Sequence, residues 1–186
     1  MPDEIADDFG NKRFDICKEK CTKILITNPD NGIALYYLGY IAETEKDYDT
    51  ALKHFKRLTE LEPHFPFVWS HIGDVYHDLK KFDQAFHAYT EEIRIYNKKA
   101  MPWCMASLCA HKLGQHETAM GILKLAQEKV EKDGQSIISF ALGSLEEIAG
   151  NDDDALANYI QGQLSAVDDE NKDISAKSIY KMLTKK

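Results

Sequence analysis

Apolar and polar positions alternate along this chain with the period of an amphipathic helix. Leu35, Leu38, Gly39 and Ala42 lie at i, i+3, i+4 and i+7, and together they form one predicted helix face. Segments of this kind follow one another, and none has the two-residue alternation of a strand. The pattern therefore predicts an all-α protein.

The helical pattern repeats itself. Gly39 and Ala51 are followed, 34 residues later in each case, by the same residue types at Gly73 and Ala85. The last copy comes two residues late, because a short insertion lies near residues 132–135. A fixed period of this length predicts stacked helix pairs, since each pair exposes apolar surface that only a neighbouring pair can bury.

Small and turn-forming residues occupy set places within each copy. Gly39 leaves room for the partner helix to approach, and Phe55 on the second helix fills the space beside it. Gly114 and Gly150 fall just past the ends of first helices, where we expect a left-handed C-cap. Pro63 separates one copy from the next, because proline ends a helix.

These positions resemble the tetratricopeptide repeat, whose signature is W-x2-L-G-x2-Y, then A-x3-F, then P. The copy at 66–99 keeps most of this signature, with Trp69, Ile72, Gly73, Tyr76, Ala85 and Tyr89. The resemblance covers residues 13 to about 169. It implies a right-handed α-α superhelix, a solenoid of about ten helices that ends in a C-terminal capping helix.

The repeat period also predicts the boundaries of the copies. We expect an irregular or weakly helical N-terminus at 1–12, the repeat array at 13–169 and the capping helix at 170–186. Within the array, a half repeat at 13–31 precedes full repeats at 32–65, 66–99, 100–133 and 136–169.

Composition narrows the classes of partner. The formal net charge of −8 argues against nucleic acid, which requires a basic surface. Every apolar stretch is too short to span a bilayer, so we expect no membrane insertion. Four cysteines are too few for a disulfide framework, and they favour a cytoplasmic protein with reduced thiols.

The family resemblance implies that the first helix of each pair lines a concave groove, which holds a peptide or a helix of a partner. The positions that this predicts for the groove are Ile33, Tyr36, Tyr40, Phe67, Ser70, Asp74, His77, Met101, Cys104, Leu108, His111, Ile137 and Phe140. Many of them are aromatic or otherwise apolar, which is typical of the centre of a binding surface. The alternative is that some of them fill the core between copies.

Members of the family that bind the acidic tails of heat-shock chaperones carry cations and amides at set positions of the groove. Those positions here hold Tyr36, Tyr40, His71, Met101 and Met105. None is a permanent cation able to pair with a carboxylate, so we expect no partner of that type.

Motifs that would indicate catalysis are absent from the sequence, which has no phosphate-binding loop, no HExxH and no calcium loop. Asp74, His77 and Asp78, with His111 one copy later, carry metal-ligand chemistry on one helical face. Such a cluster more commonly binds water or a polar ligand. We therefore expect neither an enzyme nor a bound cofactor or metal.

The function predicted from the sequence is that of a protein-interaction module, a scaffold or adaptor whose groove takes a mainly apolar peptide or helix of a partner protein. Two alternatives remain open. One is a dedicated chaperone, of the kind that serves bacterial secretion systems and sequesters an apolar client segment. The other is a regulatory or targeting domain of a larger enzyme.

Overall fold

The computed structural model of the chain describes residues 2–165, with side chains from Glu4 to Gly162. Ten α-helices and one short 3-10 helix lie in this range, and none of its residues forms a strand. The predicted all-α fold is therefore confirmed. The capping helix predicted at 170–186, with the end of the last predicted repeat, lies outside the described residues.

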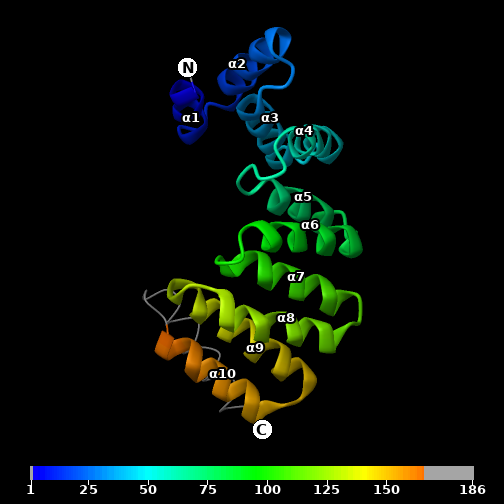
Figure 1. Cartoon of the computed structure of the whole chain (residues 1–186), viewed down its shortest axis with the longest axis vertical. Coiled ribbons are helices and arrows are strands. Elements are labelled where there is room, and N and C mark those ends of the chain that lie inside the picture. The colour runs from blue at the N-terminus through cyan, green and yellow to red at the C-terminus, as the bar shows by residue number, and fades with distance from the viewer. Residues whose placement is uncertain (1, 166–186) are drawn as a thin grey trace. The chain divides into compact units, whose positions relative to one another are not determined.

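The chain forms two compact units, residues 1–81 and 82–186, which we call unit 1 and unit 2. Unit 1 contains five helices, labelled in Figure 1: α1 (Pro2–Gly10), α2 (Phe14–Thr27), α3 (Gly32–Thr44), α4 (Tyr48–Leu61) and α5 (Val68–Asp78). Each of these helices packs against the next, and α3 also contacts α5.

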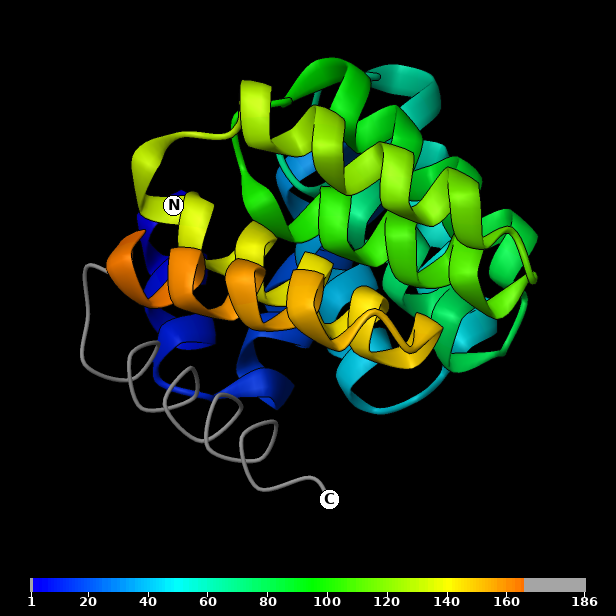
Figure 2. The same cartoon turned by 90° about the horizontal axis from the view of Figure 1, so that it is seen from below.

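The described part of unit 2 contains α6 (Phe82–Ile95), α7 (Ala100–Lys112), α8 (His116–Lys129), the 3-10 helix η1 (Lys132–Gly134), α9 (Gln135–Ala149) and α10 (Asp152–Ser165). Successive helices pack together here too, and α9 and α10 run side by side (Figure 2). The insertion foreseen near residues 132–135 is η1, whose start is fixed by a hydrogen bond from Glu131 N to Lys98 O.

The N-terminal segment is more regular than expected. Residues expected to be irregular or weakly helical form α1, which packs against α2. Ile5 is 3% exposed and belongs to a core cluster with Cys17 and Cys21. The acidic composition of this segment gave no sign of a buried helix. Asp8 can be buried because it is paired with cations outside α1.

The first helix of every described pair is followed, within two residues, by a residue in the left-handed conformation. The backbone φ is 58° at Lys12, 62° at Lys46, 57° at Lys80, 78° at Gly114 and 82° at Gly150. In each case the following amide bonds back to a carbonyl in the last turn, as Asp47 N does to Ala42 O at 2.8 Å. The C-caps predicted at Gly114 and Gly150 are confirmed. Three lysines take the same conformation without the freedom of glycine.

Close packing within a pair depends on the predicted contact between glycine and an aromatic ring. A Cβ atom at Gly39 would lie 2.6 Å from the Phe55 ring, and one at Gly143 would lie 2.7 Å from the Tyr159 ring. Neither position has room for a larger residue, so the repeat signature sets the distance between these helices.

The copy that places serine in the glycine position packs differently. Ser107 is 2% exposed, and its hydroxyl donates a 2.9 Å hydrogen bond to the backbone carbonyl of Ala119. The aromatic slot of this copy holds Leu123. A smaller plug therefore leaves space for the Ser107 side chain, and the hydrogen bond satisfies its buried hydroxyl.

Candidate functional site

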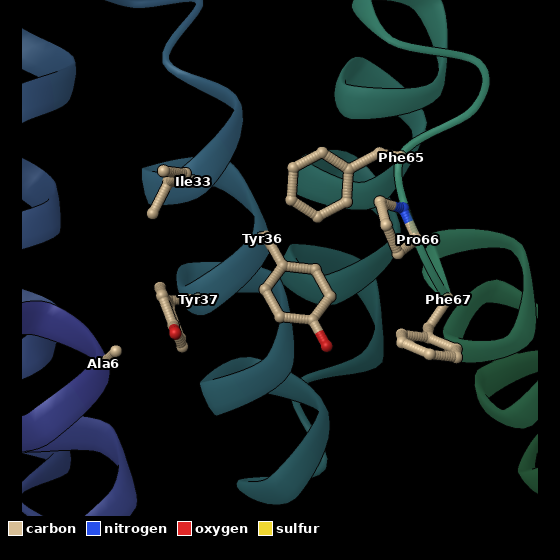
Figure 3. Close-up of a pocket in the computed structure, with 7 residues that line it drawn as sticks. All are labelled: Ala6, Ile33, Tyr36, Tyr37, Phe65, Pro66 and Phe67. Carbon is tan, nitrogen blue, oxygen red and sulfur yellow. The ribbon is translucent and has the colours of Figure 1, made fainter. Parts of the chain in front are cut away.

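A pocket of about 330 Å³ opens between α1, α3 and the loop that leads into α5, all within unit 1. Its walls are mainly apolar and consist of Ala6, Ile33, Tyr36, Tyr37, Phe65, Pro66 and Phe67. In Figure 3, Tyr36 lies between Ile33 and Tyr37 on one side and the residues of the loop on the other. Three of the predicted groove residues, Ile33, Tyr36 and Phe67, therefore line one cavity.

Phe67 is held in an unfavourable state on two counts. Its φ of 64° places an aromatic residue in the left-handed region, immediately before α5 begins. Its side chain is also 54% exposed. A strained backbone of this kind costs about 1–3 kcal/mol, and such strain is concentrated at functional sites.

Tyr40, one turn beyond Tyr36, contributes to packing between first helices. Its ring lies 4.8 Å from that of Phe9 on α1 and 4.9 Å from that of His71 on α5. Both contacts have edge-to-face geometry, which is a favourable arrangement for aromatic rings. Tyr40 therefore joins three first helices, and it is half-buried.

Charge is distributed unevenly between the helices of unit 1. The first helices α1, α3 and α5 contain seven Asp and Glu residues and no Lys or Arg, whereas α2 and α4 contain six Lys and Arg. Some of these acids are already paired. Asp8, for example, accepts from Lys20 at 2.6 Å, and this interaction with Lys20 lowers the pKa of Asp8.

The acidic and histidine side chains near α5 form a different cluster from the one predicted from the sequence. Asp74 lies beside Glu43 of α3 and His71 of α5, with one ligand atom of each within 4.8 Å of the others. Asp78, predicted to join Asp74, instead accepts a 2.9 Å hydrogen bond from the Tyr48 hydroxyl. Ser70 and His77, also predicted for the groove, are half-buried.

The predicted groove residues of unit 2 fall into two groups. Met101 is 59% exposed, and Leu108 and His111 are half-buried. Cys104 and Ile137, by contrast, pack against the core cluster around Trp103 and Leu123, and burial raises the pKa of the Cys104 thiol to about 12. The Phe140 ring lies directly over Gly162 of α10. Cys104, Ile137 and Phe140 thus contribute to core packing, which agrees with the alternative interpretation of this face.

His111 also forms a pair that the repeat pattern did not predict. Its Nδ1 lies 2.9 Å from Nδ1 of His116, at the edge of a pocket of about 230 Å³ that Met120 and Leu145 also line. Burial, followed by the nearby His116, lowers the pKa of His111.

Sequence reasoning missed the loop that closes the unit 1 pocket. Phe65 and Pro66 lie outside the helical period from which the groove was derived. A usable signal was present, because two phenylalanines around a proline are too apolar for an ordinary exposed connection.

None of the described helices is long and apolar enough to cross a membrane. Repeated helix pairs with a glycine–aromatic contact, and a left-handed cap after each first helix, define an α-helical repeat protein. Tetratricopeptide-repeat family models match residues 32–65 and 68–99. The chain is a tetratricopeptide-repeat protein.

Protein bimA of Emericella nidulans is 32% identical over 75 residues, which are 40% of this chain and 9% of bimA. The chain spans about a tenth of the length of the curated relatives it matches. Among solved structures, the thermophilic TPR protein TTC0263 from Thermus thermophilus has a TM-score of 0.67 at 21% identity, over 95% of each chain. YrrB, described as a TPR protein with an unusual peptide-binding site, has a TM-score of 0.65 at 19% identity, over 89% of this chain and 90% of YrrB.

Proposed function

We propose that this chain is a cytoplasmic protein-interaction module, and that unit 1 binds a partner segment in which a bulky apolar side chain stands next to a basic residue. The apolar side chain enters the pocket beside Tyr36 and Phe67, and the basic residue lies against the acidic first helices. Binding of a protein partner, rather than catalysis, is the activity that we assign to the chain.

The observation that carries this proposal is the state of Phe67. An aromatic side chain that is more than half exposed, on a backbone with positive φ, is unfavourable in the isolated protein. Covering this ring with a partner would recover part of that free energy. Aromatic residues beside a preformed pocket are also typical of the residues that dominate binding.

The size of the pocket supports one anchoring side chain rather than a whole peptide. At about 330 Å³, the pocket is at the lower end of the range for small-ligand sites. Burial of one leucine or phenylalanine contributes about 1.5–3 kcal/mol, so further contacts along the first helices would be needed for tight binding.

Charge supports a basic residue beside the anchor. No Lys or Arg occurs on α1, α3 or α5 themselves. Arg13 and Lys20 pair with acids of α1, so a partner's cation would mainly meet the carboxylates of α5. This is the reverse of a site for acidic chaperone tails. Charge complementarity of this kind contributes mainly to the rate and specificity of association.

A display library of random short peptides, panned against the full chain, tests the proposal. We expect enrichment of peptides with an aromatic or leucine residue close to Lys or Arg. The enriched peptide, labelled with a fluorophore, is then titrated with wild-type protein and with Phe67→Ala, which should weaken binding about tenfold or more.

Met101→Ala is the matched control, because Met101 is also an exposed large apolar side chain, at 59% against 54% for Phe67. We expect this variant to bind like the wild type. Enrichment of acidic peptides, or equal losses in the two variants, would contradict the proposal. A client chaperone, an adaptor and a regulatory domain would all use the same pocket, and they differ in the partner that carries the selected motif.

A further inference from the structure

Three potential metal ligands from two helices meet beside the Tyr40 and Phe55 rings of unit 1. Glu43 comes from the last turn of α3, and His71 and Asp74 are one turn apart on α5. One ligand atom of each lies within 4.8 Å of the other two. All three residues are half-buried, so the group is partly accessible to solvent.

Glu43 and His71 form a close, half-buried ion pair when the imidazole is protonated. His71 Nδ1 lies 2.9 Å from Glu43 Oε2, and each of the two atoms exposes less than 1 Å² to solvent. Neither atom has a well-directed hydrogen bond. Buried polar atoms are nearly always paired, so two such atoms facing one another call for a physical explanation.

The second ring nitrogen of His71 also has a polar neighbour, and this contact is linked to which nitrogen carries the proton. His71 Nε2 lies 3.1 Å from the Tyr36 hydroxyl. With the proton on Nδ1, His71 donates toward Glu43 and accepts from Tyr36. With the proton on Nε2, the ring donates to Tyr36, and Nδ1 directs a lone pair toward the carboxylate. In that second tautomer, a cation bound by both atoms stabilises the contact. Metal-bound histidines commonly have their second nitrogen fixed by a hydrogen bond in this way.

The imidazole is also held in place from both sides. The Phe55 ring stacks on it at 5.4 Å with an interplanar angle of 13°, and the Tyr40 ring meets it edge-on at 4.9 Å. A ligand whose orientation is fixed before binding loses less conformational entropy when it binds.

We propose that Glu43, His71 and Asp74 bind a divalent transition metal of the Zn²⁺ class. Two ligands about 2.1 Å from a tetrahedral metal lie about 3.4 Å apart, so Nδ1 and Oε2, which are 2.9 Å apart, separate slightly when the metal binds. The three ligand atoms lie within 4.8 Å of one another, so a rotation of the Asp74 side chain is needed to bring its oxygen to the ligand separation of about 3.4 Å. One imidazole and two carboxylates favour Zn²⁺ over Cu⁺, which prefers sulfur.

This site does not depend on the proposed peptide-binding function. It differs from the cluster of Asp74, His77 and Asp78 considered in the sequence, because it uses one residue of α3. A metal here links α3 to α5, and three protein ligands leave at least one coordination position for water or a partner.

Calorimetric titration with Zn²⁺ alone tests the site, using the full chain with His111→Gln and His116→Gln as the starting protein. Those two changes remove the His111–His116 pair of unit 2, which could bind Zn²⁺ itself. The measured stoichiometry then reports on the proposed site. We expect one Zn²⁺ per chain and a melting temperature that rises with Zn²⁺. Adding His71→Gln should weaken binding by more than about 100-fold and abolish the thermal shift.

Glu43→Gln is a second variant, and it should also weaken Zn²⁺ binding. It keeps the proposal testable if His71→Gln disturbs the fold. Circular dichroism of both variants without metal verifies that the helices remain. A starting protein that does not bind Zn²⁺, or correctly folded variants that bind it as the starting protein does, would overturn the proposal. The first of those results would leave the Glu43–His71 contact as a simple ion pair.

Discussion

In unit 1 the first helices α3 and α5, with the loop between copies, present aromatic rings and carboxylates around a pocket, whereas in unit 2 comparable positions of α7 and α9 pack into the core. Tyr36 and Phe67 line a cavity, while Cys104 and Ile137 pack on the core cluster. Both units are built from the same repeat. The comparison teaches that the signature residues fix how helices pack, and that the residues between them decide whether a face is free to bind.

The largest effect should come from the glycine position of the two units. Gly39→Ala places a methyl group 2.6 Å from the Phe55 ring, and we expect it to lower the free energy of unfolding by about 1–3 kcal/mol. Ser107→Ala, at the same position in unit 2, removes only a hydrogen bond and should cost about 1 kcal/mol. Chemical denaturation measures both.

Gly121→Ala is the control, since a Cβ there meets nothing within 4 Å and the helix should become slightly more stable. Equal destabilisation by Gly39→Ala and Ser107→Ala would mean that the two units pack alike at this position.

The next effect separates packing from binding on the first-helix face. Tyr40→Ala removes ring contacts with Phe9 and His71, and we expect unit 1 to lose about 1–2 kcal/mol of stability. Met101→Ala in unit 2 should change stability by less than about 0.5 kcal/mol, because the side chain is 59% exposed. Thermal melting of the two single variants decides the matter, and a stable Tyr40→Ala would return Tyr40 to the binding surface.

How far the sequence predicted this molecule depends on whether a feature belongs to the repeat. The 34-residue period was enough to locate the helices and the glycine–aromatic contacts, because packing depends on side-chain size. It placed the left-handed caps at Gly114 and Gly150, but not at Lys46, because lysine carries no signal for positive φ. The segment that forms α1 was expected to be only irregular or weakly helical, because its buried carboxylate is paired with residues outside it.

The candidate site shows the same division. Ile33, Tyr36 and Phe67 could be predicted because they follow the helical period or begin the next helix. The core role of Phe140 depends on Gly162, a contact with α10 that no local pattern reveals. The meeting of Glu43 with His71 likewise requires the packing of α3 against α5.

A smaller effect should follow from the left-handed caps. Lys46→Gly in unit 1 relieves a strained φ of 62°, and we expect the free energy of unfolding to rise by about 0.5–1 kcal/mol. Gly114→Ala in unit 2 imposes the same strain at φ of 78° and should lose about 1 kcal/mol. Urea denaturation measures the free energy of unfolding of both variants. A lower value for Lys46→Gly than for the wild type would show that the lysine side chain stabilises its turn.

The smallest effect is confined to acid pH and to α1. Hydrogen bonding from Lys20 lowers the pKa of Asp8 below its ordinary value of 3.8 in the folded chain. Asp8 therefore stabilises unit 1 at pH values above 3.8, and this stabilisation is lost as the pH falls through the lower folded pKa. Hydrogen exchange should show α1 opening first on acidification, while helices of unit 2 keep their protection.

Asp8→Asn should remove this acid dependence of exchange in α1 and leave unit 2 unchanged. Unchanged acid opening of α1 in Asp8→Asn would assign the effect to other carboxylates.

Each compact unit carries one of the two tryptophans of the chain, held by the same hydrogen bond. Trp69 Nε1 donates to Pro63 O at 3.1 Å in unit 1, and Trp103 Nε1 donates to Asn97 O at 3.0 Å in unit 2. Trp103 is 5% exposed and Trp69 is half-buried, so their emission maxima should differ. The protein thus contains a separate fluorescent reporter for each half, and replacing either tryptophan with phenylalanine leaves a probe of the other half alone.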